Sequence, residues 1–160
     1  MRKQRELKLP SSKESIRAIE EFSERISDEY FLNDSYFGNI ITCLTEAVEN
    51  AIVHGNRMDE SKRIRVKMEE KVEGLMFTVI DQGEGFDARP FLEGIPDEGK
   101  GEGIFLIRSL ADEVSITDHG RVISMLFRIT GIDEKVADSR RQQMEKFYKT
   151  THKLSGQELD

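Results

Sequence analysis

Two periodicities of hydrophobic residues alternate along the chain, and together they predict a domain with both helices and strands. Apolar positions recur at helical spacing through residues 16–30 and 37–52, and a shorter helical pattern covers residues 104–110. Alternating positions or short apolar runs predict the strands of a sheet, at residues 6–9, 64–69, 75–80, 114–117 and 122–129.

Residues with capping side chains mark the expected ends of the two long helices. Ser11 and Glu14 stand at the spacing of a capping box before the first helix, and Asn33 or Asp34 can cap the second. The second helix is expected to end near Gly55. Its predicted apolar face consists of Phe37, Ile41, Leu44, Val48, Ala51 and Ile52.

Two segments depart from these patterns. Residues 81–103 lose periodicity and contain six glycines, which is unusual inside a compact domain and typical of a lid or a binding loop. Residues 133–160 carry few large apolar side chains, and we expect a helix over residues 133–150 followed by a frayed end. We interpret this extension as a solvated appendage, with a docking helix as the alternative.

Composition narrows the possible functions. The 160 residues suit one domain with a tail, and a net charge of −7 without a concentrated basic stripe argues against nucleic acid as the main ligand. Cys43 is the only cysteine, which favours a reducing compartment. No apolar run has membrane length and no secretory signal is present, so we expect a cytoplasmic protein without a membrane partner. The three histidines are far apart, which argues against a zinc site.

The second predicted helix carries a polar stripe. At about 100° per residue, Glu46, Asn50 and His54 share a face opposite Leu44 and Val48. An asparagine oxygen is a hard ligand suited to Mg²⁺, and a carboxylate one turn away can accept a proton. The alternative is the solvated face of an ordinary amphipathic helix, and this segment alone favours that alternative.

Two further glycine-containing segments lie at the ends of predicted elements and offer groups that can bind a ligand. Asp81 directly follows an apolar strand and precedes Gly83 and Gly85. A carboxylate there can accept a hydrogen bond from an exocyclic amine, while the glycines let the backbone approach a flat ring. Gly101 and Gly103 precede a predicted helix, whose N-terminus attracts anions such as phosphate. An ordinary glycine-rich turn and a hinge without a ligand are the respective alternatives.

In their order along the chain, the three segments resemble the motifs of the Bergerat-fold (GHKL-type) ATP-binding superfamily. Residues 46–55 (EAVENAIVHG) are similar to its N-box, residues 81–86 (DQGEGF) to its first glycine box, and residues 101–107 (GEGIFLI) to its second. Within the superfamily, the chain looks most like the anti-sigma-factor serine protein kinases, over about residues 5–130.

The resemblance implies an α+β fold, a two-layer α/β sandwich in which helices cover one face of a mixed, mostly antiparallel sheet. It divides the chain into an ATP-binding domain, residues 1–132, and the C-terminal extension, residues 133–160. One departure from the family lies at Arg121, which follows Gly120 where relatives commonly have threonine.

The resemblance also implies a role for each matching position. Glu46 would be the catalytic base, Asn50 the ligand of Mg²⁺ beside the ATP phosphates, and Asp81 the acceptor for the adenine amino group. Residues 87–100 would form a lid over the nucleotide. The remaining ATP-binding positions would be Gly83, Gly85, Lys100, Gly101 and Gly103.

The implied activity is that of a Mg-ATP-dependent serine/threonine protein kinase acting as an anti-sigma factor. Such a protein phosphorylates an anti-sigma-factor antagonist, sequesters a sigma factor and forms a homodimer. An ATP-binding regulatory module without significant kinase turnover is the alternative. A detached histidine-kinase catalytic domain is a weaker third, because the chain lacks a helix pair carrying a phosphoacceptor histidine.

Overall fold

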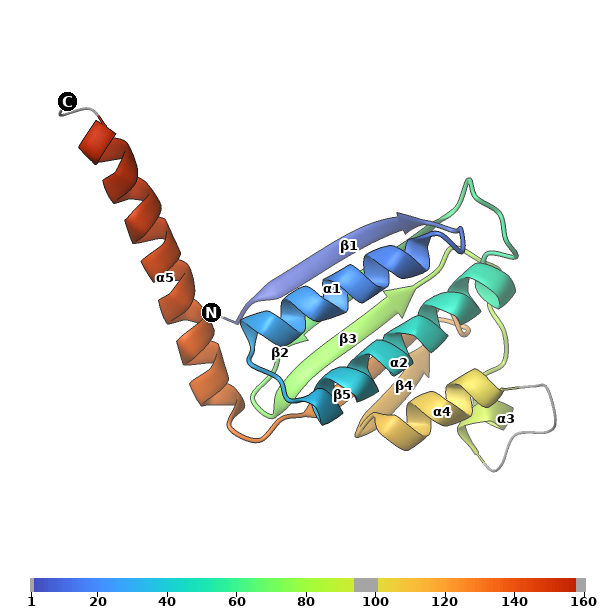
Figure 1. Cartoon of the computed structure of the whole chain (residues 1–160). Helices are drawn as coiled ribbons and strands as arrows, with labels where there is room; N and C mark the ends of the chain where they lie inside the picture. The colour runs from blue at the N-terminus through green and yellow to red at the C-terminus, as the bar shows by residue number, and fades with distance from the viewer. Residues whose placement is uncertain (1, 94–100, 158–160) are drawn as a thin grey trace.

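Five strands form one antiparallel sheet, and helices cover one of its faces (Figure 1). The computed structural model describes residues 2–93 and 101–157, with side chains described up to residue 152. Every described pairing is antiparallel, which confirms the predicted two-layer α+β sandwich and makes its sheet purely antiparallel rather than mixed. The spatial order β1-β2-β3-β5-β4 comprises β1 (Gln4–Pro10), β2 (Arg63–Glu70), β3 (Gly74–Ile80), β4 (Glu113–Thr117) and β5 (Val122–Arg128).

The covering layer consists of α1 (Ser15–Glu29), α2 (Asp34–Asn50) and α4 (Glu102–Leu110). α2 runs directly into a π-helical turn, η1 (Ala51–Gly55), and a short helix, α3 (Arg89–Leu92), precedes α4. Hydrophobic periodicity did not predict η1 or α3, because an element of about one turn is too short to establish a period.

The core lies between the sheet and this helical layer. Alternate residues of β2, namely Ile64, Val66 and Met68, are buried as predicted, and the positions between them are partly exposed. Phe77 of β3 packs edge-to-face on Phe127 of β5, with 5.9 Å between ring centroids. The strands therefore present one apolar face to the helices, as period-two alternation requires.

The buried face of α2 is broader than the pattern predicted. Phe37 and Ile41 are only partly buried, whereas Ile40, Cys43 and Ala47 are fully buried. α2 lies between α1 and α4, so small side chains at both edges of its stripe are covered as well. Cys43 is a small core residue, and burial raises the pKa of its thiol to about 12.

The two predicted helix caps have different outcomes. The Asn33 side chain accepts a hydrogen bond from the Tyr36 amide at 2.9 Å, so this cap of α2 is confirmed. The capping box at Ser11 and Glu14 is wrong, because Glu14 is itself the residue preceding α1 and makes no capping bond. A turn in which the Ser15 amide bonds to the Ser12 carbonyl delays the start of the helix, and the Ser11 hydroxyl is buried with no hydrogen-bond partner among the described residues.

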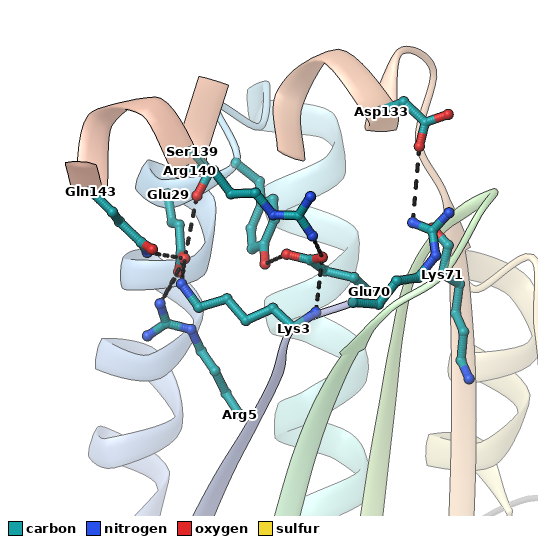
Figure 2. A network of polar contacts seen from close by, with 11 residues as sticks. Lys3, Arg5, Glu29, Glu70, Lys71, Asp133, Ser139, Arg140 and Gln143 are labelled. Atoms are coloured by element: carbon teal, nitrogen blue, oxygen red, sulfur yellow. Dashed lines mark hydrogen bonds and ion pairs between the residues drawn. The ribbon is translucent and has the colours of Figure 1, made fainter. Parts of the chain in front are cut away.

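The C-terminal helix α5 (Ile132–Gln157) begins against the sandwich and then leaves it (Figure 1). Its first turns bury Ile132 and Val136, and polar contacts bind the next turns to two carboxylates of the body, Glu29 and Glu70 (Figure 2). Beyond them the described side chains are exposed, including Met144, Phe147 and Tyr148. Among the described helices, none is both long enough and apolar enough to cross a membrane.

Glu70 is the more buried of these carboxylates, at 3% exposure. One oxygen accepts a 2.6 Å hydrogen bond from the Tyr30 hydroxyl, and the other accepts from the Lys3 amide at 3.0 Å and from Arg140 at 3.4 Å. Replacing Tyr30 with phenylalanine should lower the free energy of unfolding by about 1.5–3 kcal/mol, because a buried carboxylate oxygen loses its donor. Chemical denaturation of both proteins would measure this difference.

Replacing Tyr36 with phenylalanine is the matched control. The Tyr36 hydroxyl also bonds to the protein, accepting from the Thr130 amide at 3.2 Å, but this contact is exposed to solvent. Water can replace the lost hydroxyl there, so we expect a loss of about 1 kcal/mol or less. Equal losses in the two variants would contradict the importance assigned to the buried Glu70 contact.

Candidate functional site

A cavity of about 440 Å³ lies where α2 and η1 meet the end of β3 and the start of α4. Its apolar lining comprises Ala47, Ala51, Val79, Phe86, Phe91, Ile104 and Ile123. Its polar lining comprises Asn50, His54, Asp81, Asp87 and Glu102. A concave site of this size, mostly apolar with a few polar groups, is typical of small-molecule binding.

Asp81 is the buried carboxylate of this cavity. It follows β3 directly and is 9% exposed, and its Oδ1 accepts a 2.8 Å hydrogen bond from the Gly83 amide. Burial raises the pKa of Asp81, while the Gly83 amide and the positive charge of Arg121 act in the opposite direction. The side chain is thus held in one orientation in an apolar wall, where it can accept a hydrogen bond from an amine.

The glycines next to Asp81 permit close backbone contacts. A Cβ atom on Gly83 would collide with the Gly55 carbonyl, and one on Gly85 would collide with the His119 carbonyl. Gly85 also has a φ of +87°, which favours glycine. Neither glycine lines the cavity; both hold the turn that carries Asp81 against its neighbours.

Glu46 and Asn50 of α2 face the first turn of α4. A Cβ atom added to Gly103 would lie 2.8 Å from Glu46 Oε2 and 3.3 Å from Asn50 Nδ2, so the three residues are brought together. Asn50 and Gly103 line the cavity; Glu46 does not line it but lies next to Gly103. Burial raises the pKa of Glu46, and the nearby charge of Glu49 raises it further. Both of these side chains of the predicted stripe therefore face α4, and Asn50 also faces the cavity, unlike an ordinary solvated helix face.

The N-terminus of α4 closes another side of the cavity. Gly101 precedes the helix with a φ of +74°, and a Cβ atom there would collide with the Phe91 ring. Gly101 and Gly103 both line the cavity. The first amides of a helix have no partner within it and attract anions, so this wall suits a phosphate group. Asn50 offers an amide oxygen nearby, and the donor set as a whole fits a magnesium–nucleotide complex.

The predicted lid is described only in part. Lys100 and the rest of residues 94–100 lie outside the described residues. Within the described part, Phe91 of α3 lines the cavity and contacts Phe86 edge-to-face, with 5.7 Å between ring centroids. Sequence reasoning gave no role to Phe91, although an aromatic residue within a glycine-rich segment was a possible signal for a wall facing a flat ligand.

Asn56 joins the elements that surround the cavity. It is fully buried; its Nδ2 donates to the Arg63 carbonyl at 3.2 Å, and its Oδ1 accepts from the Gln82 amide at 2.8 Å. The Gln82 side chain in turn accepts from the Arg63 amide at 2.7 Å. The end of η1, the start of β2 and the turn after β3 are therefore fixed together. His54 lines the cavity but is largely exposed.

Known proteins share this architecture. The RsbU and RsbW domains of Rv1364c from Mycobacterium tuberculosis, known from a crystal structure, match with 19% identity and a TM-score of 0.57. The match covers 79% of this chain and 32% of that one, so this chain spans under half the length of the protein it matches. At this identity the likeness concerns the fold. Comparison with curated proteins gives no match.

The sandwich and its apolar cavity with a fixed carboxylate define a small-molecule-binding domain. The family of the histidine kinase-like ATPase domain matches residues 9–127, which is most of the chain, and the chain therefore belongs to this family. Membership implies ATP binding and supports the resemblance to the GHKL-type superfamily.

Proposed function

We propose that this protein is a Mg-ATP-dependent serine/threonine protein kinase that acts as an anti-sigma factor. It would phosphorylate a serine of an anti-sigma-factor antagonist and sequester a sigma factor. The observation that carries the proposal is the position of Glu46, a carboxylate of raised pKa next to Gly103, which lines the cavity together with Asn50. A family member that only bound ATP would not need a base at this point.

The proposed nucleotide contacts follow from the lining of the cavity. Asp81 would accept a hydrogen bond from the adenine amino group, with Gly83 and Gly85 fixing the turn behind it. The amides around Gly101 and Gly103 would bind phosphate oxygens. Lys100 would add a positive charge to them, and Asn50 would be the protein ligand of Mg²⁺. When bound, Mg²⁺ neutralises phosphate charge.

The proposed reaction transfers the terminal phosphoryl group to the hydroxyl of a serine. The Glu46 carboxylate accepts the hydroxyl proton as the serine oxygen bonds to the γ-phosphorus. The bond from that phosphorus to the bridging oxygen breaks, and ADP leaves. The raised pKa of Glu46 improves its strength as a base, since a catalytic group works best with a pKa closer to the working pH.

Calorimetric titration with a non-hydrolysable ATP analogue, with and without Mg²⁺, tests the binding site. We expect micromolar, Mg²⁺-dependent binding, weakened about tenfold or more in Asn50→Ala, because the amide oxygen is lost as a metal ligand. Failure of the wild-type chain to bind in any condition would contradict the proposal. Binding without phosphorylation of any serine-containing partner would favour the ATP-binding regulatory module instead.

The rest of the proposal concerns the assembly of the protein. The partners would be the sigma factor and its antagonist, in the cytoplasm, with no direct contact to nucleic acid or membrane. The kinase would act as a homodimer. Residues 1–132 would form the ATP-binding domain, and residues 133–160 a helical extension.

Gly103→Ala tests whether α4 must approach Glu46 and Asn50 closely. Alanine suits a helix, but its Cβ atom would lie 2.8 Å from Glu46 Oε2, so that side chain and Asn50 must move. We expect nucleotide affinity to fall about tenfold, since misplaced ligands bind less well. Titration with the same ATP analogue would measure this loss.

Gly38→Ala is the matched control in α2. A Cβ atom on Gly38 would meet no heavy atom within 4 Å, so the variant should stabilise the helix by up to about 1 kcal/mol. Nucleotide affinity should stay unchanged. If Gly103→Ala binds the analogue as tightly as Gly38→Ala does, the close approach of α4 has no part in the site.

A further inference from the structure

Arg121 connects two turns that lie at one end of the sheet. It belongs to the turn between β4 and β5, residues 118–121, and its guanidinium group reaches the turn after β3, residues 81–86. Its Nε donates to the Gly83 carbonyl at 2.8 Å, and its Nη2 donates to the Glu84 carbonyl at 3.0 Å. Its Nη1 donates to the carbonyl and the carboxylate of Asp118, at 3.0 Å and 3.3 Å.

Backbone contacts hold the same two turns at their ends. The Asp81 amide donates to the Arg121 carbonyl at 3.0 Å, and the Phe86 amide donates to the His119 carbonyl at 2.6 Å. Between these two points, the carbonyls of Gly83 and Glu84 are bound by the Arg121 side chain. An arginine presents its donors in a rigid fork, so it fixes both carbonyls relative to the 118–121 turn.

The charge of Arg121 also acts on Asp81. It opposes the effect of burial on that carboxylate and favours the ionised form, as Lys62 does, while Asp118 acts in the other direction. Arg121 itself does not line the 440 Å³ cavity. Its side chain bonds the 81–86 turn, which carries Asp81, and this turn connects the arginine to a ligand in the cavity.

We propose that Arg121 is a positioning residue for the base of the nucleotide, because it fixes the 81–86 turn so that the Asp81 carboxylate faces the cavity. The inference rests on the proposed function, since it takes the ligand to be an adenine nucleotide.

The test compares two nucleotides in matched arginine variants. Dissociation constants are measured by calorimetry for a non-hydrolysable ATP analogue and for its inosine counterpart, which lacks the 6-amino group. In Arg121→Ala the affinity for the ATP analogue should fall about tenfold, as expected for a misplaced charge-assisted hydrogen bond. The affinity for the inosine analogue should change much less. Arg121→Lys, which keeps the charge and a donor, should recover part of the preference for adenine.

Arg128→Ala is the control. Arg128 lies at the other end of β5 and donates to Glu113 at 2.6 Å, away from the cavity, so both affinities should match those of the wild type. Hydrogen exchange in the free protein gives a second measurement: Arg121→Ala should speed exchange within residues 81–86, and Arg128→Ala should not.

Three results would overturn the inference. In the first, Arg121→Ala and Arg121→Lys both keep wild-type affinity and base preference. In the second, Arg121→Ala loses affinity for both nucleotides in equal proportion, so that the arginine serves general stability only. In the third, the wild-type chain binds neither nucleotide. That last result overturns the proposed function as well. Titration of the wild-type chain reveals it before any variant is tested.

Discussion

Replacing Glu46 with glutamine is expected to lower the rate of phosphate transfer by about 10²- to 10⁴-fold, the usual contribution of a positioned general base. The substitution keeps the size of the side chain and removes its capacity to accept a proton from the proposed serine substrate. Nucleotide binding should remain within a few-fold of the wild type, because Asn50 and Asp81 are unchanged. Single-turnover transfer from radiolabelled Mg-ATP to the proposed antagonist protein would measure the rate, and calorimetry would measure the binding.

The pH dependence of the wild-type reaction follows from the same role. As the proposed base, Glu46 would act only when ionised, so the rate should rise with pH through its pKa and then level off. Burial and the charge of Glu49 raise that pKa above its ordinary value of 4.5, so the acid limb should lie at a higher pH than for an exposed glutamate. In Glu46→Gln this acid limb should disappear.

Glu49→Gln provides the matched control for Glu46→Gln. Glu49 lies on the same helix but is exposed, so its loss should leave the rate on the plateau nearly unchanged. Its negative charge raises the pKa of Glu46, and its removal should therefore shift the acid limb to lower pH. A Glu46→Gln variant that transfers phosphate as fast as Glu49→Gln would exclude Glu46 as the base.

Local patterns predicted most of the fold. Each strand of the sheet lies within one or two residues of its predicted range, because a strand with one covered face alternates visibly along the sequence. The full width of the buried face of α2 was not predictable in this way. It depends on α1 and α4 packing at its two sides, and that arrangement is set by tertiary structure.

The same distinction between local patterns and tertiary contacts applies to the residues of the candidate site. Glu46, Asn50, Asp81 and the glycines could be predicted because they occur in compact segments that resemble the motifs of a known superfamily. The contacts of Arg121 could not, since its partners at Gly83 and Glu84 are 38 and 37 residues away and are carbonyl groups that any residue type would supply. A long-range contact to a backbone carbonyl does not require a particular residue type in the partner, so the sequence does not predict it.

The second large effect is expected at Asp81. In Asp81→Asn, the amide oxygen can accept from the Gly83 amide, as Asp81 Oδ1 does now at 2.8 Å, but the NH₂ group then occupies the other position. A donor would face the donor amino group of adenine. Affinity for the ATP analogue should fall about 100-fold, since a hydrogen bond to a charged group is lost and two donors oppose each other.

Binding of the inosine analogue distinguishes loss of the adenine hydrogen bond from general damage to the site. Its base presents a carbonyl oxygen where adenine has an amino group, so the asparagine NH₂ can donate to it, and Asp81→Asn should prefer inosine where the wild type prefers adenine. Asp87→Asn is the control, because Asp87 also lines the cavity but is exposed and paired with Arg89 at 2.9 Å; its base preference should not change. Equal loss of both nucleotides in Asp81→Asn would mean that Asp81 supports the cavity without reading the base. A reversal of preference would instead assign the adenine contact to this carboxylate.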